Sequence, residues 1–224
     1  MKAKTLITSC CLFAIMACGT AFAQQGKMMS GPYKGPMGPA VAPEIPDAAP
    51  FYTNLVTNPC VTSQMYSSDN GFLVLGPNNC FLAGATQWIA YPFVASKTGT
   101  VRKVQLAVTL DNAGLGCTST TSAFTVQIYS DACTGVPVSP LGSAATANAP
   151  AGPPSLATAN FRTGAALTLG TQYWVVVTTS TAATQTGTTA VWWQTTFATQ
   201  GFNLNDGNGW ISAPLGGPGA FNVQ

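Results

Sequence analysis

The chain has 224 residues, of which only 6% are charged, and its formal net charge at pH 7 is +2. It contains no histidine, so the commonest general base is missing and neither a Ser-His nor a Cys-His nucleophile can be built. Its few cations are not clustered, which excludes the polybasic surfaces that bind nucleic acid or anionic membranes.

Residues 1–23 are predicted to be a secretory signal peptide. Lys2 and Lys4 precede an apolar run, and Ala21-Phe22-Ala23 forms a small-x-small cleavage site. The mature chain is then expected to begin near Gln24. Without Lys2 and Lys4, six of the eight basic residues remain against six acidic residues, so its charge is close to zero.

A lipoprotein signal is the alternative reading of the same segment. Residues 15–18, Ile-Met-Ala-Cys, are similar to the sequence at which a bacterial prolipoprotein is cut and lipidated, which would place the lipid on Cys18. The apolar run is too short to cross a bilayer, and no later segment approaches the ~20 apolar residues required. We therefore expect an exported protein without a transmembrane segment, located in the periplasm, in the medium or at the cell surface.

Residues 24–50 are crowded with Pro and Gly and hold little that could pack. Gly31, Gly35 and Gly38 do not keep a period of three, which excludes a collagen-like helix. This composition predicts a disordered spacer. The remaining residues, 51–224, have the length of one domain.

Within that domain the dominant hydrophobic period is two, which indicates strands with one face on a core. Large apolar residues alternate with polar or small ones at 104–110 and 124–128, and Ile89, Tyr91 and Phe93 lie on one side of another candidate strand. The stretch 173–179 is apolar on both faces and is predicted to be a central strand. No ten-residue stretch has helical spacing, and turn-forming pairs such as Asn70-Gly71 separate the candidates. We predict an all-β fold, an antiparallel sandwich of jelly-roll type with about eight to eleven strands.

Four cysteines follow the signal peptide, and in an exported chain four cysteines indicate two disulfides. Three connectivities are possible, and pairs within compact excursions of the chain are favoured. A zinc site would need close Cys-Cys spacing or a histidine, so no metal cofactor is predicted. The favoured pairs are Cys60 with Cys80 and Cys117 with Cys133.

The carboxylates of the domain lie in predicted turns, where an aspartate accepts hydrogen bonds from nearby backbone amides. They are Asp69, Asp111, Asp131 and Asp206. The pair Ser96-Lys97 lies on a predicted hairpin rim, where adjacent side chains point apart. No catalytic residue is predicted, and we expect a protein that is not an enzyme.

An oxygen-rich stretch near the C-terminus is a weak candidate for calcium, which takes such ligands. The ligand register of an EF-hand loop is absent, and Asp-Gly-Asn-Gly is a strong hairpin-turn signal. A turn is therefore the favoured interpretation. The four candidate ligands are Asn203, Asn205, Asp206 and Asn208.

Aromatic side chains are the remaining candidates for binding, since sugar rings stack on exposed aromatic faces. Trp192 and Trp193 are adjacent, so on a strand one faces the core and the other faces away. Trp210 and Tyr129 complete the candidate set for a carbohydrate ligand. Core packing is the competing explanation for each tryptophan.

Five segments occur in an order that resembles the choice-of-anchor domains of secreted bacterial proteins, choice-of-anchor R in particular. They are TQWIAYPFVASKTGTVRKVQLAV, FTVQIYSDACTGVPVSPLGSA, LTLGTQYWVVVTT, WWQTT and DGNGWIS. The resemblance spans roughly residues 72–223 and implies an extracellular β-sandwich without an established activity. The last five residues, AFNVQ, carry no recognisable sorting signal, so release or anchoring through Cys18 is expected.

Together these features predict a non-catalytic, exported β-sandwich that serves as a cell-surface or extracellular structural or adhesion module. The alternative is a carbohydrate-binding module that uses exposed tryptophans. The expected partners are extracellular polysaccharides or other surface proteins.

Overall fold

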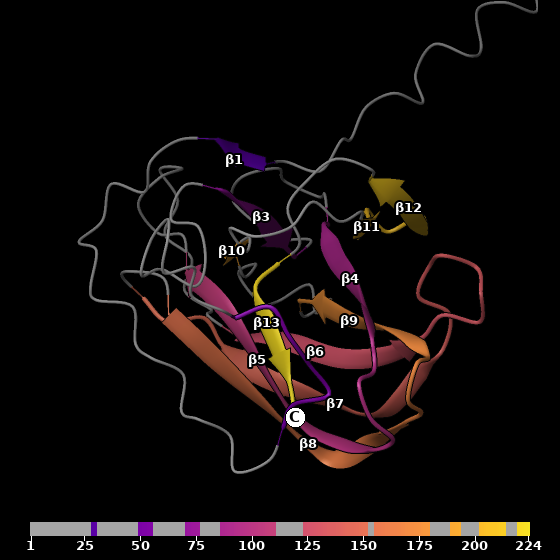
Figure 1. Ribbon diagram of the computed structural model, residues 1–224. Helices are drawn as coiled ribbons and strands as arrows, with labels where there is room; N and C mark the ends of the chain where they lie inside the picture. Colours follow the sequence, from indigo (N-terminus) through magenta and orange to yellow (C-terminus); the bar gives the residue numbers. More distant parts are fainter. Residues whose placement is uncertain are drawn as a thin grey trace, which may run out of the picture.

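The computed structural model describes residues 28–30, 49–55, 70–76, 86–110, 123–151, 155–179, 189–193, 202–213 and 219–224. These residues form strands and turns and no helix, and every pairing between strands is antiparallel, which confirms the all-β prediction (Figure 1). The strands are β1 (Met28–Ser30), β2 (Tyr52–Thr53), β3 (Asn70–Leu75), β4 (Trp88–Val94), β5 (Gly99–Leu110), β6 (Ala123–Ser130), β7 (Pro140–Asn148), β8 (Ser155–Leu167), β9 (Gln172–Thr178), β10 (Thr189–Trp193), β11 (Phe202–Asn205), β12 (Trp210–Ala213) and β13 (Phe221–Val223).

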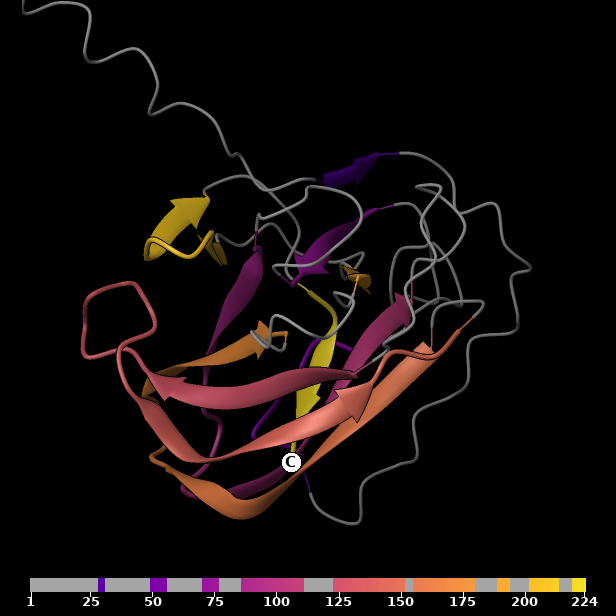
Figure 2. The same cartoon turned by 180° about the vertical axis from the view of Figure 1, so that it is seen from behind.

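Two sheets pack face to face. One has the order β1-β3-β10-β5-β13-β2, with β8 also paired to β5, and the other has the order β12-β11-β4-β9-β6-β7. Seen from behind, β6, β7 and β8 lie one after another across the lower half of the molecule (Figure 2). We call the second sheet the outer-row sheet, after a row of side chains from Trp210 to Thr146 that runs across its solvent side.

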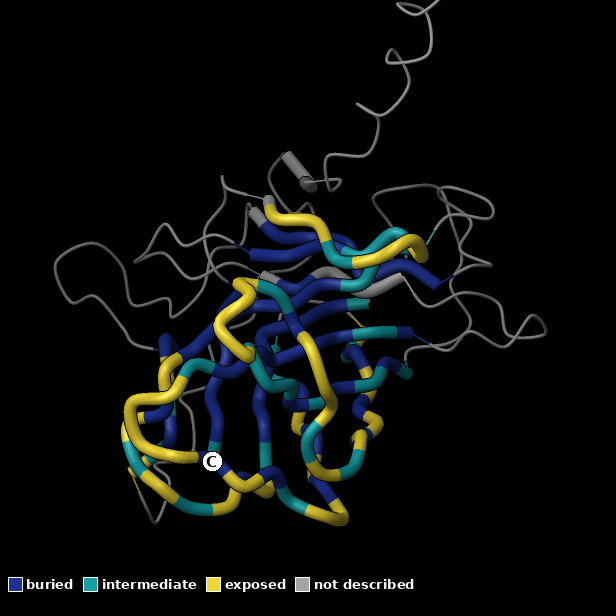
Figure 3. The backbone as a smooth tube through the Cα atoms, turned by 90° about the vertical axis from the view of Figure 1, so that its right-hand side faces the viewer, coloured by how far each residue is buried: buried dark blue, intermediate teal, exposed yellow. Residues whose placement is uncertain are grey.

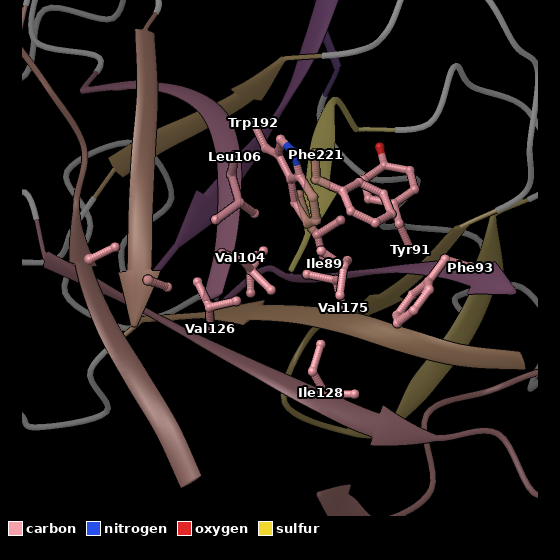
Figure 4. Packing of buried hydrophobic residues seen from close by; sticks show 14 of the residues in the cluster. Ile89, Tyr91, Phe93, Val104, Leu106, Val126, Ile128, Val175, Trp192 and Phe221 are labelled. Atoms are coloured by element: carbon pink, nitrogen blue, oxygen red, sulfur yellow. The ribbon is translucent and has the colours of Figure 1, made fainter. Parts of the chain in front are cut away.

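The core lies between the two sheets and is built by the alternation seen in the sequence. Inward-facing residues of β4, β6 and β9 point at residues of β5, β10 and β13 (Figure 4). The buried stretches run through the middle of the strands, and exposed residues gather at turns (Figure 3). Labelled in the close-up are Ile89, Tyr91, Phe93, Val104, Leu106, Val126, Ile128, Val175, Trp192 and Phe221.

Strand β9 was predicted to be central, and it pairs with β4 on one side and with β6 on the other. Its residues 173–177 are all buried. Tyr173, Val175 and Val177 face the core, while Trp174 and Val176 belong to a separate apolar cluster on the opposite face. This double burial explains the run of apolar residues in the sequence.

The two sheets meet where β7 crosses β8. Gly142 has a φ of +66°, and a Cβ there would lie 2.7 Å from the carbonyl oxygen of Thr163. A Cβ on Gly164 would collide with the carbonyl oxygen of Val101. Both positions therefore require glycine for close backbone approach.

The described part of the chain holds thirteen strands, more than predicted, because several are only two or three residues long. One of them, β1, lies inside the predicted spacer and pairs with β3, so that segment is not entirely unstructured. The jelly-roll topology stays a prediction, since several connections run outside the described residues. Among the described residues, no helix is long and apolar enough to cross a membrane.

Candidate functional site

The solvent side of the outer-row sheet carries a second, smaller cluster of apolar side chains. Ala90, Trp174 and Val176 are buried there, although they point away from the main core. Tyr129 and Trp210 are partly buried and pack against them. This face is therefore aromatic, and its side chains come from β4, β6, β9 and β12.

Register places one row of side chains across all six strands of this sheet. Asn205 pairs with Trp210 on one side and with Trp88 on the other. Thr125 pairs with Thr178 and with Thr146. Because β4 and β9 are antiparallel and Ile89 pairs with Val177, Trp88 lies opposite Thr178. We call this set the outer row: Trp210, Asn205, Trp88, Thr178, Thr125 and Thr146.

The outer row is accessible, whereas the residues beside it are covered. Five members are half-buried and Thr146 is exposed. Their neighbours Asn203, Ala90 and Val176 on the same face are buried. The row thus forms a strip of two tryptophans, one amide and three hydroxyl groups.

The loop of residues 131–139, between β6 and β7, bonds to the same face. The Nε1–H group of Trp174 donates a 2.8 Å hydrogen bond to Oδ1 of Asp131, and Nδ2 of Asn203 donates a 2.9 Å bond to the carbonyl oxygen of Gly135. Figure 1 shows this loop projecting below β12. Within it, Ala132 and Cys133 adopt positive φ angles of 45° and 59°. The loop closes one side of the face.

Two polar groups of the face are buried to different degrees. Tyr129 is partly buried, and this burial raises the pKa of its hydroxyl above the usual value. Nε1 of Trp88 is sealed from solvent and has no hydrogen-bond partner among the described residues. An unpartnered indole N–H is costly, and it is a donor for any acceptor that reaches it.

The described basic side chains lie away from the outer row. Lys97 is in the turn before β5, Arg102 and Lys103 are in β5, and Arg162 is in β8. The strands β5 and β8 belong to the opposite sheet. The outer row itself carries no charged residue.

The structure corrects the predicted sugar-binding set at Trp192. This side chain is fully buried, its Nε1–H donates to the carbonyl oxygen of Ala220 at 3.1 Å, and its ring packs edge-on against Tyr91. Trp192 therefore belongs to the core and cannot stack on a ligand. The side chain of Trp193 lies outside the described residues.

Trp210 and Tyr129, by contrast, lie on one face of one sheet, as a binding site would require. Trp88, which no pattern in the sequence singled out, shares that face, and so does Asn205, which the sequence suggested only as a calcium ligand. The register of β11 with its two neighbours is what joins them to Trp210. The sequence could have indicated only that Trp88 faces away from the core, because it precedes the inward-facing Ile89 in the strand.

Two of the four candidate calcium ligands, Asn205 and Asp206, hold the turn between β11 and β12, as favoured. Oδ1 of Asn205 accepts from the amides of Gly207 and Gly209, and Oδ1 of Asp206 accepts from the amide of Asn208. Asn203 points away from this turn, toward Gly135. The Oδ1 atoms of Asn205 and Asp206 are therefore occupied by backbone amides.

The pair Ser96-Lys97 bonds to the chain segment just before β2. Ser96 donates to the carbonyl oxygen of Pro50, and Lys97 donates to that of Ala49 and lies 4.6 Å from the ring centre of Phe51. This pair thus fastens the entry of the chain into the domain. Asp69 and Asp111 lie outside the described residues.

Cys133 has a free, exposed thiol, so the predicted bond from Cys133 to Cys117 is not seen. The remaining cysteines of the predicted pairs, Cys60, Cys80 and Cys117, lie outside the described residues, as does Cys18. The disulfide pairs and the lipidation therefore stay predictions.

Comparison with known proteins adds no relative: no family model matches the chain, and searches of curated proteins and of solved structures found no match either. The resemblance to choice-of-anchor domains accordingly rests on the sequence motifs alone.

Proposed function

We propose that this chain is an exported, non-catalytic β-sandwich that acts as a structural or adhesion module at the cell surface or in the extracellular matrix. The observation that carries the proposal is the outer row, a strip of partly accessible aromatic, amide and hydroxyl side chains across a six-stranded sheet. Aromatic side chains with polar neighbours are typical of binding surfaces.

The chemistry of the described acidic groups supports binding rather than catalysis. Asp131 accepts a hydrogen bond from Trp174, and Asp206 accepts one from the amide of Asn208. Both carboxylates stabilise loops of the fold. The absence of histidine from the sequence removes the commonest general base.

Binding to the cell envelope tests the proposal. The purified full-length exported chain is mixed with washed envelopes of the cells that produce it and is then sedimented. We expect saturable binding that an excess of unlabelled chain displaces. Binding that never saturates, or none at all, contradicts an adhesion role.

Mass spectrometry of the N-terminus tests export and anchoring. A chain that starts at Gln24 indicates signal peptidase cleavage, which is the favoured reading. A diacylated Cys18 indicates the lipoprotein alternative. A retained Met1 in exported material contradicts both.

A further inference from the structure

We propose that the outer row is a binding site for a neutral polysaccharide that lies across the strands of the sheet. This inference rests on the proposed adhesion function and names its ligand. The evidence is the pairing of Trp210 and Trp88 on either side of Asn205, on a face that carries no cation among its described residues.

The spacing of the two tryptophans suits a chain of sugar rings. They lie on β12 and β4, with β11 between them, so the backbones that carry them are about 10 Å apart. The apolar faces of sugar rings stack on aromatic planes, while their hydroxyl groups bond to amides and hydroxyls. Trp210 and Trp88 supply the planes.

Asn205 is held in place between the two rings. Its Oδ1 is fixed by the amides of Gly207 and Gly209 at 2.8 and 3.4 Å. Its Nδ2 makes no hydrogen bond with a described residue, so it remains a donor for a sugar oxygen. Thr178, Thr125 and Thr146 extend the strip with hydroxyl groups.

The unpartnered indole of Trp88 is a second observation that points to a ligand. Its Nε1 is buried without an acceptor among the described residues. A sugar hydroxyl that displaces the covering atoms would accept this hydrogen bond and remove the cost of an unsatisfied donor. Trp192, in the core, has its own acceptor at Ala220.

The charge of the face and its covered neighbours restrict the charge of the ligand and the direction in which it lies. An anionic polymer would be drawn to the described cations, three of which lie on β5 and β8 of the opposite sheet. The face of the outer row offers no such partner, which suits an uncharged polymer. Beside the row, Trp174 is covered, and the loop of residues 131–139 bonds to this face. A ligand therefore follows the row across the strands.

Titration calorimetry of the full exported chain tests the site. The probes are four soluble neutral polymers, namely β-glucan, mannan, xylan and amylose, with alginate as the anionic counter-probe. We expect at least one neutral polymer to bind and alginate not to bind. Raising the salt from about 0.05 to about 0.5 M should change the affinity less than about twofold, because no ion pair is involved.

Matched variants locate the binding. Trp210→Ala should weaken binding at least about tenfold, as loss of an aromatic anchor does, and Trp88→Ala should act in the same direction. Ile211→Ala is the control, since Ile211 is exposed on the same strand but has the opposite strand phase. Because Trp210 lies on an edge strand, Trp210→Ala decides the result if Trp88→Ala fails to fold.

The outcomes separate this inference from the proposed function. Binding to none of the four neutral polymers, or equal binding by Trp210→Ala and the wild type, overturns the polysaccharide site. If envelope sedimentation still saturates in that case, the adhesion role stands with another ligand. Loss of envelope binding after periodate oxidation of the envelope glycans supports the polysaccharide site independently.

Discussion

The indole nitrogen of Trp174 donates a 2.8 Å hydrogen bond to the carboxylate of Asp131, 43 residues earlier in the chain. This bond joins the middle of β9 to the loop that follows β6. A second bond, from Asn203 to Gly135, ties the same loop to β11. Together they hold residues 131–139 against the face that carries the outer row.

Removing one partner of the hydrogen bond between Trp174 and Asp131 should destabilise the domain. Asp131→Ala leaves the Trp174 N–H in a largely buried position without its acceptor, and we expect a loss of about 1–2 kcal/mol in the free energy of unfolding. Urea unfolding measures it. Asp206→Ala is the matched control, because the exposed turn bond to Asn208 should cost less than about 1 kcal/mol. Combined Asp131→Ala and Trp174→Phe losses that simply add would contradict the coupling.

The sequence placed Asp131 in a predicted turn but did not indicate the partner of its carboxylate. Ile128 is buried and Tyr129 faces the other way, as the alternation indicated. The Asp131 carboxylate was expected to accept from turn amides, whereas it accepts from an indole on another strand. Local pattern shows that a residue lies in a turn; only the pairing of β6 with β9 brings Trp174 within reach.

Gly164 of β8, which lies against the backbone of β5, should be irreplaceable. In Gly164→Ala the new methyl group meets the carbonyl of Val101 and the side chain of Thr100, and backbone atoms cannot move aside cheaply. We expect a loss of about 2–3 kcal/mol, measured by urea unfolding.

Gly170→Ala separates steric collision from backbone strain. Gly170 has a φ of +76° and open space around its Cβ position, so only strain of about 1 kcal/mol is expected. If Gly164→Ala costs no more than Gly170→Ala, the close approach of β8 to β5 at Gly164 is wrong.

Alkaline conditions should destabilise the domain through buried tyrosines. Burial raises the pKa of Tyr91 well above 10.0, partly offset by a backbone hydrogen bond with Gly219, and burial also raises the pKa of Tyr52 and Tyr129. Below pH ~10 the phenols are neutral in both states, so the stability is fully present. Above it the unfolded chain loses protons first, and stability falls as pH rises toward the folded pKa values.

Equilibrium unfolding between about pH 8 and pH 11 checks this dependence, at a slope of up to ~1.4 kcal/mol per pH unit for the fully buried Tyr91 and a smaller one for the partly exposed Tyr52 and Tyr129. Tyr91→Phe should lower stability at neutral pH, because the hydrogen bond with Gly219 is lost. The same variant should flatten the alkaline decline. An unchanged decline in Tyr91→Phe would exclude Tyr91 as its cause.

Period-two alternation was enough to predict the core strands, because each face of a strand is defined by its own sequence. It could not assign Trp192 and Trp193, since both phases of that short strand are apolar; the structure buries Trp192 against Tyr91. The outer row could not be predicted from the sequence for a different reason. It is a relation between six strands, from residue 88 to residue 210, and register between distant strands is set by tertiary pairing.

The central claim is that the solvent face of the outer-row sheet makes the contacts by which this protein binds. Two threonines on opposite sheets test it most directly: Thr125 lies within the outer row, and Thr158 is exposed on β8. An arginine at either position adds the same bulk and charge to a solvent-facing strand site. In envelope sedimentation we expect Thr125→Arg to abolish saturable binding and Thr158→Arg to retain it. Equal binding by the two variants, or loss only in Thr158→Arg, would contradict the claim.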